Sequence, residues 1–250
     1  MKLPLISSLI ALTVLANSAF AGDRRFTYTY ETTTLPKGAA EFETWVTWKA
    51  YRSDGPDRDK FEFRHEFEIG ITDKLQLGLY LPNWSVDKVE GMESKSKFDS
   101  VGAELIYNLS NPTTDWLGSA IYGEVRGGED LCVLEGKILL QKNIGSWIFA
   151  WNGIVEAEWE GKGLEEEIGV LEQTLGVSYQ FTPKFSLGVE AKHEIEFEEW
   201  SEAGDHVVYA GPNMSFRYKD MFVALTGMVQ VTDVEGKADA QTRLIVGFHF

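Results

Sequence analysis

The sequence predicts an all-β fold, a transmembrane antiparallel β-barrel of about 12 strands. Three observations support this prediction. The first 21 residues have the composition of a secretory signal, and about 12 later segments alternate between apolar and polar residues. The chain also ends in such a segment, Ala240 to Phe250, whose last residue is aromatic. Because successive side chains of a strand point to opposite faces, each segment offers one face to lipid and the other to a lumen.

The predicted signal peptide covers Met1 to Ala21. Lys2 is its only charged residue, an apolar run follows from Leu3, and the segment closes on Ala19, Phe20 and Ala21. We expect cleavage before Gly22. A retained membrane helix is the weaker interpretation, because the uninterrupted apolar run is shorter than the roughly 20 residues that a bilayer requires.

Composition narrows the remaining choices. The formal net charge is −16, which disfavours nucleic acid as a partner, since binding it requires clustered cations. Cys132 is the only cysteine, so no intrachain disulfide can form. After residue 21 no apolar run approaches the length of a spanning helix, so a membrane crossing must use strands. With no linker between residues 39 and 250, one barrel domain is the simplest organisation.

The first four predicted strands cover residues 41–50, 61–69, 74–84 and 98–108. The first places Phe42 and Trp48 on the face opposite Glu43. In the third, alternate positions are leucine from Leu75 onwards. This period of two residues is typical of a strand with one apolar face.

The next four strands cover residues 116–126, 131–141, 147–159 and 171–181. The first of them is rich in glycine, so its faces stay unassigned. In the strand from Trp147 to Trp159, aromatic and aliphatic residues oppose Asn152 and Glu156, a pattern that no helical period fits.

The last four strands cover residues 185–198, 206–218, 221–231 and 240–250. The final strand must pair with the first to close the sheet and leave no open edge.

The connections alternate between tight and longer segments, as in barrels with short periplasmic turns and longer outer loops. Tight joints are expected at 72–74, 111–112, 142–143, 182–184 and 219–220, and outer joints at 53–58, 85–97, 127–130, 161–165, 201–205 and 233–237. Both ends of the barrel chain then lie on the periplasmic side.

Aromatic residues gather at the predicted strand ends. Such placement is typical of the two girdles at the membrane interfaces, whereas a secreted β-sandwich, the alternative fold, would not sort them in this way. The candidate interface residues are Trp48, Trp84, Trp116, Trp147, Trp159, Trp200, Tyr218 and Phe250.

The first third of the mature chain contains motifs that resemble outer-membrane proteins of Gram-negative bacteria with no established function. More distantly, they resemble the group labelled putative phenol-degradation (meta-pathway) outer-membrane proteins. The motifs are Tyr28-Thr29-Tyr30-Glu31, Leu35-Pro36-Lys37-Gly38, Glu41-Phe42-Glu43-Thr44-Trp45, Phe63-Arg64-His65-Glu66 and Gly70-Ile71-Thr72-Asp73-Lys74. The resemblance implies an outer-membrane location and movement of small molecules, and it brings no catalytic residues. In the resembling proteins a terminal aromatic also marks the chain for the barrel insertion machinery, which makes this machinery and outer-membrane lipid the expected partners.

The polar phase of the strands is strongly acidic. Its acidic members are Glu41, Glu43, Glu62, Glu66, Glu68, Glu156, Glu158, Glu190, Glu194, Glu196 and Glu198. A lumen wall with mostly negative charge would concentrate cations. The alternative is that these acids pair with the basic residues of the same phase, Arg64, Lys192, Arg217 and Arg243.

Other chemistry has weaker support. A divalent metal near Glu156, Glu158, Glu194 and Glu196 is conceivable, but no calcium-loop motif accompanies these residues, so no metal or cofactor is predicted. A hydrolase would need a nucleophile beside a base, and none of His65, His193, His206 and His249 lies in such a motif.

Residues 22–38 precede the first strand and would make the strand count odd if they formed a thirteenth. We expect a periplasmic lead or a segment inside the lumen, where it would narrow the pore; a disordered terminus is the alternative. The sequence therefore predicts an outer-membrane barrel that acts as a narrow, cation-biased channel for small solutes. The rival interpretation is a non-conducting barrel with a ligand-binding or structural role.

Overall fold

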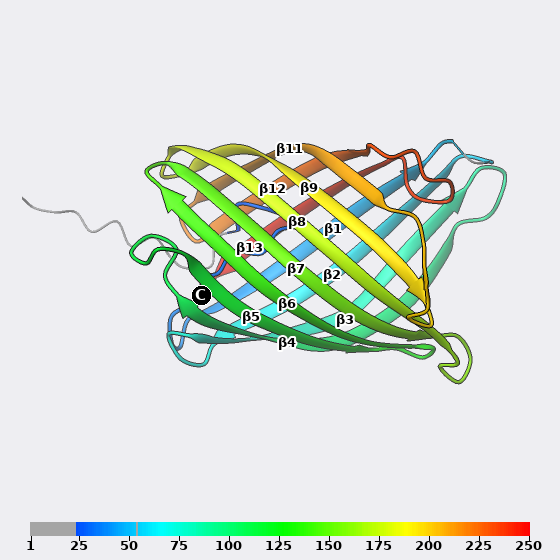
Figure 1. Cartoon of the computed structure of the whole chain (residues 1–250), viewed down its shortest axis with the longest axis horizontal. Coiled ribbons are helices and arrows are strands. Elements are labelled where there is room, and N and C mark those ends of the chain that lie inside the picture. Colours follow the sequence, from blue (N-terminus) through cyan, green and yellow to red (C-terminus); the bar gives the residue numbers. More distant parts are fainter. Residues whose placement is uncertain (1–23, 54) are drawn as a thin grey trace, which may run out of the picture.

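The computed structural model describes residues 24–53 and 55–250; the predicted signal peptide and its cleavage site lie outside these residues. The described chain forms strands joined by turns and loops (Figure 1). The strands are β1 (Ala40–Tyr51), β2 (Arg58–Gly70), β3 (Leu75–Val89), β4 (Lys95–Ser110), β5 (Gly118–Gly127), β6 (Leu131–Ile144), β7 (Trp147–Glu160), β8 (Glu166–Thr182), β9 (Phe185–Glu198), β10 (Glu202–Ala203), β11 (Val207–Tyr218), β12 (Met221–Gln230) and β13 (Ala240–His249). Among the described residues, no helix is long and apolar enough to cross a membrane.

The sheet closes on itself. Each long strand pairs antiparallel with its neighbours, β13 pairs with β1, and β8 pairs with β9. β10 is a two-residue extension that pairs with β9 at the end of that strand. Within residues 24–53 and 55–250, the barrel therefore has 12 strands, and the predicted fold class is confirmed. Figure 1 shows these strands tilted around the barrel, as closure of a sheet requires.

The side chains alternate between lumen and outer surface as the sequence pattern predicts. On β13, Gln241 and Ile245 are buried inside the barrel, whereas Phe248 faces outward and is 44% exposed. Outward aliphatic side chains such as Ile138 and Val189 are more than half exposed. A contiguous apolar surface of this kind is the face that a bilayer covers.

The two ends of the barrel differ, and we name them by their connections. At the terminal end, where β1 begins and Phe250 lies, the connections are residues 71–74, 111–117, 145–146, 183–184 and 219–220. At the loop end they are residues 52–57, 90–94, 128–130, 161–165, 199–206 and 231–239.

Three predicted connections differ from the structure. The tight joint predicted at 142–143 lies within β6, and the turn follows at residues 145–146; the joint predicted at 111–112 extends over residues 111–117. The sequence predicts a long outer joint over residues 85–97, but β3 and β4 continue through most of it and leave only residues 90–94 as a turn. Asp87 pairs with Lys95 in this extended hairpin. The sequence here resembled a loop because its charged residues leave no apolar face.

Candidate functional site

Residues 24–39, the plug, lie inside the barrel before β1 begins. Phe26, Tyr28, Tyr30 and Leu35 are buried, with 1% to 6% of each side chain exposed. The plug reaches the lumen wall of β9 near Thr27 and returns to the terminal end near Lys37, where Asp73 of the β2–β3 turn accepts a hydrogen bond from the Lys37 amide. The lumen is thus occupied by the chain's own N-terminal segment.

Side chains of the barrel wall form hydrogen bonds with the backbone amides and carbonyls of the plug. The carboxylate of Glu190 on β9 accepts hydrogen bonds from the amides of Thr27, Tyr28 and Thr29 at 2.8 to 3.0 Å. Asn152 on β7 accepts from the Tyr30 amide and donates to the Tyr30 carbonyl. Buried backbone groups outside a sheet require such partners, so these contacts fix the path of the plug.

Further wall contacts continue along the plug. Gln141 accepts a hydrogen bond from the Thr32 amide, and Gln76 accepts one from the Leu35 amide, each at 2.8 Å. Phe26 packs over Gly176 of β8, where an added Cβ would lie 2.7 Å from the ring. The glycine provides the space that the ring fills.

An aromatic and cationic layer lies where the plug meets the wall. The Arg24 guanidinium sits 4.4 Å from the centre of the Tyr30 ring, and Lys137 Nζ sits 4.1 Å from the same ring. Arg243 stacks 4.1 Å from the Tyr28 ring. Each cation faces a ring, and Arg24 and Lys137 also contact Glu43 and Glu135, whereas Arg243 donates to the Thr47 hydroxyl and the Thr27 carbonyl.

On the loop side of this layer lies a cavity of about 910 Å³, the outer cavity. Tyr28, Tyr30 and Trp45 are among its lining residues, and Lys95, Lys97 and Asp130 line it near the loop end. Among the described residues that line it, ten are acidic and ten are basic. The outer cavity is polar, with balanced formal charge.

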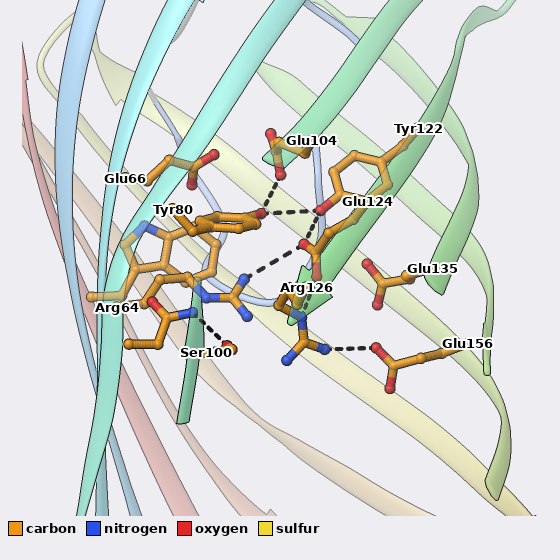
Figure 2. Close-up of polar contacts among 12 residues, drawn as sticks. Arg64, Glu66, Tyr80, Ser100, Glu104, Tyr122, Glu124, Arg126, Glu135 and Glu156 are labelled. Atoms are coloured by element: carbon orange, nitrogen blue, oxygen red, sulfur yellow. Dashed lines mark hydrogen bonds and ion pairs between the residues drawn. The ribbon is translucent and has the colours of Figure 1, made fainter. Parts of the chain in front are cut away.

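A chain of polar contacts links the outer cavity to the interior of the wall (Figure 2). The Tyr80 hydroxyl contacts Glu104 and lies 3.1 Å from the Tyr122 hydroxyl. Tyr122 donates to Glu124. Further along the same chain of contacts, Arg126 contacts Glu124 and bonds Glu156 at 2.9 Å.

The acidic residues predicted for the lumen divide into two groups. Glu41, Glu43, Glu66 and Glu68 are buried in the terminal half of the barrel, with exposed fractions of 0% to 3%. The others lie further along the strands: Glu62, Glu156, Glu158, Glu190, Glu194, Glu196 and Glu198. Glu190 is the plug's anchor, whereas Glu196 and Glu198 are exposed at the loop end.

Of the predicted bases, Lys192 contacts a predicted acid, Glu194, and both Lys192 and Arg64 contact acids that the sequence did not single out. Lys192 Nζ lies 2.6 Å from Glu194 and 3.2 Å from Glu172, and Arg64 lies 3.9 Å from Glu124. Arg243 donates to the Thr47 hydroxyl. Arg217 occupies the lumen phase of β11, one residue before the terminal end of that strand.

Sequence reasoning missed part of the lumen. Glu104, Glu124, Glu135, Lys137 and Glu172 share the polar phase of their strands, and alternation alone could have identified them. Trp45, Tyr80 and Tyr122 are buried in the lumen although aromatic residues ordinarily indicate the lipid face. The sequence could have shown this, because each of these residues occupies the same alternate positions of its strand as the lumen-facing acids.

The histidines lie at three places. His65 Nδ1 is 3.2 Å from the Thr44 hydroxyl on the outer wall, and His249 Nδ1 is 2.9 Å from Glu41 inside. His193 and His206, which the sequence did not bring together, stack with their ring nitrogens 2.9 Å apart.

At the loop end, two connections are joined by Asp239. Its carboxylate accepts hydrogen bonds from the Ser53 hydroxyl and from the amides of Arg52 and Ser53. The Ser53 hydrogen bond, with those of the backbone amides, holds the pKa of Asp239 below its usual range. The contact ties residues 52–53 to the β12–β13 loop.

The aromatic residues proposed for the interfaces lie near strand ends. Trp48, Trp84 and Trp200 are near the loop end, each 38% to 41% exposed, and Trp48 donates to Asp59. Trp159 is partly exposed near the same end. At the terminal end, Trp116, Trp147, Tyr218 and Phe250 are 47% to 89% exposed.

Solved structures with a similar fold include an outer membrane channel, a translocator domain and a porin. The COG4313 outer membrane channel from Pseudomonas putida F1 is 12% identical, with a TM-score of 0.67 over 90% of this chain and 100% of that chain. The translocator domain of the autotransporter NalP from Neisseria meningitidis is 12% identical, with a TM-score of 0.55 over 86% and 89%. The NanC porin is 10% identical, with a TM-score of 0.54 over 82% and 98%.

No curated protein matches the sequence. A family of unknown function matches residues 18–144 and 148–245, which include nearly the whole barrel. The chain therefore belongs to this family, DUF6662.

Proposed function

We propose that the protein is an outer-membrane channel of a Gram-negative bacterium that passes small solutes and is narrowed by its own plug. The terminal end then faces the periplasm and the loop end faces outward. The observation that carries the proposal is the outer cavity of about 910 Å³, a polar compartment that begins near the loop end and has plug residues Tyr28 and Tyr30 in its lining. A polar cavity inside an apolar outer wall is the arrangement that water-filled barrels use.

The comparisons support the same class of function. Two of the similar solved structures, the COG4313 channel and the NanC porin, are described as a channel and a porin. Their identity to this chain is 10% to 12%, so the likeness in fold supports the proposal without identifying a solute.

We place the cation bias in the terminal half. The outer cavity has balanced charge and favours neither sign by formal charge alone. In the terminal half, Glu41, Glu43, Glu66, Glu68 and Glu104 are buried around Arg24 and His249. Because low-dielectric walls focus the field of such a group, permeating cations are favoured over anions there.

Single-channel recording in planar bilayers tests the proposal. We expect discrete conductance steps. Across a KCl gradient, we expect a reversal potential whose sign shows that cations permeate more readily than anions. Glu41→Gln removes one carboxylate of the terminal half and should reduce this potential. Glu158→Gln makes the same chemical change at the outer cavity and should reduce it less. Absence of conductance from folded protein would refute the channel, and anion preference would refute the electrostatic part.

A non-conducting barrel that binds a ligand in the outer cavity is the second candidate. The plug favours it, since Glu190, Asn152, Gln141 and Gln76 hold its backbone at four strands of the wall. Folded protein that gives no conductance, with or without the plug, would support this candidate. The third interpretation, an outer-membrane hydrolase, would require a nucleophile beside a base, whereas His193 contacts His206 and His249 contacts Glu41.

A further inference from the structure

We propose that Glu66, Glu68 and Glu104 form a binding site for a divalent cation, with Ca²⁺ as the preferred ion. The site lies in the terminal half, apart from the outer cavity, and goes beyond the proposed channel function. Glu66 and Glu68 come from β2 and Glu104 from β4, so the site joins two strands through the strand between them.

The three carboxylates are arranged as a ligand set. One oxygen from each lies within 4.8 Å of the other two. Two oxygens on opposite sides of a Ca²⁺ ion are separated by about 4.6 to 5.2 Å, twice the usual Ca–O distance. The second oxygen of Glu66 can add a fourth ligand atom toward the roughly six to eight that Ca²⁺ takes.

Among the described residues, three of the six oxygens of this set lack the partners that burial requires. Glu66 is fully buried, and neither of its carboxylate oxygens has a hydrogen-bond partner within residues 24–53 and 55–250. Glu104 is 1% exposed, and its Oε1 is also without a partner, while its Oε2 contacts Tyr80. Buried carboxylates without partners are costly, and a cation between them removes that cost.

Arg24 of the plug does not supply the missing partner of the Glu66 carboxylate. Its guanidinium bonds Glu43 at 2.7 Å and Glu68 at 3.0 Å, but lies 3.9 Å from Glu66. The arginine therefore faces four carboxylates when Glu104 is included, whereas Glu41 contacts His249. A divalent ion beside the arginine would supply the compensation that the carboxylates of Glu66 and Glu104 lack.

Gly78 on β3 creates the space between the ligands. In the sheet register it lies opposite Glu68 on one side and Glu104 on the other. An added Cβ would lie 2.6 Å from Glu104 Cγ and closer still to a carboxylate oxygen of Glu66. The absence of a side chain allows the carboxylates of two non-adjacent strands to converge, and Figure 2 shows Glu66 and Glu104 near Tyr80.

The ligand chemistry favours Ca²⁺ over other ions. All three ligands are carboxylates, which suit hard cations, whereas zinc and copper sites usually include imidazole or thiolate. Mg²⁺ requires tighter octahedral geometry and gives up its water reluctantly, so a dry cluster of carboxylates suits it less well.

Terbium luminescence tests the site in the folded, detergent-solubilised protein. Tb³⁺ resembles Ca²⁺ in its preference for oxygen ligands, and Tyr80, which contacts Glu104, would sensitise its emission. We expect saturable emission that Ca²⁺ abolishes at a concentration at least about tenfold lower than Mg²⁺.

Variants distinguish Ca²⁺ binding at this site from nonspecific binding elsewhere on the protein. Glu66→Gln and Glu104→Gln should each weaken Ca²⁺ competition at least about tenfold. Gly78→Ala keeps every carboxylate but fills the space between them, and it should weaken binding comparably. Glu158→Gln, which removes an acid of the outer cavity, should leave the affinity unchanged.

Three outcomes would overturn the proposal. These are no saturable emission from folded wild-type protein, emission that Ca²⁺ and Mg²⁺ displace equally, and emission that survives both Glu66→Gln and Gly78→Ala. A gel shift between unheated and boiled samples verifies that each variant is folded. Since the assay needs no conductance, its result is independent of the channel proposal.

Discussion

At the residue scale, the period of two determines which side chains meet lipid and which meet the lumen. The sequence was sufficient to place Glu43 inward and Phe42 outward, because that assignment depends only on alternation within one strand. It could not identify the role of Glu190, which lies 161 to 163 residues from the amides that it binds. A contact of that range depends on closure of the whole barrel.

Glu190→Ala tests the anchor of the plug. The change leaves three buried plug amides without an acceptor and should cost about 3 kcal/mol of plug docking, or about a hundredfold in the undocked fraction. Hydrogen exchange of the amides of residues 27–29 should accelerate correspondingly. Glu160→Ala, which removes an acid near the loop end, is the matched control. Unchanged exchange in Glu190→Ala would show that the carboxylate is not the anchor.

At the element scale, the sequence predicted the 12 long strands, because apolar alternation is a strong local signal. It failed where that signal stops: β3 and β4 extend through residues with no apolar face, such as Asp87 and Lys95. The plug was equally hard to place. Its alternation over Phe26, Tyr28 and Tyr30 resembles a strand, but side chains of the wall, rather than a neighbouring strand, bind its backbone.

The contact between the two loops at Asp239 should depend on pH. A folded-state pKa below the unfolded value means that the contact contributes stability above the unfolded value, about 3.9, and loses it as pH falls through the folded value. Hydrogen exchange at residues 52–53, corrected for the intrinsic effect of pH, should therefore increase at acidic pH below about 4. Asp239→Asn should remove this dependence. An equal pH response in wild type and variant would contradict the assignment.

At the scale of the whole molecule, pairing of β13 with β1 encloses a lumen, and the plug divides it. The outer cavity lies on one side, and the buried carboxylates of the terminal half lie near Arg24 on the other. The sequence predicted closure and an acidic lumen phase. The pairing of Lys192, Arg64 and Arg126 with particular acids required the three-dimensional register of several strands.

The central claim is that the plug limits conduction through an otherwise open barrel. The most direct measurement compares single-channel conductance of the wild type with that of a variant lacking residues 24–34, both verified as folded by the gel shift on heating. We predict a small conductance for the wild type and one several-fold larger for the deletion variant. Equal conductance in the two proteins, or none in either, would contradict the account.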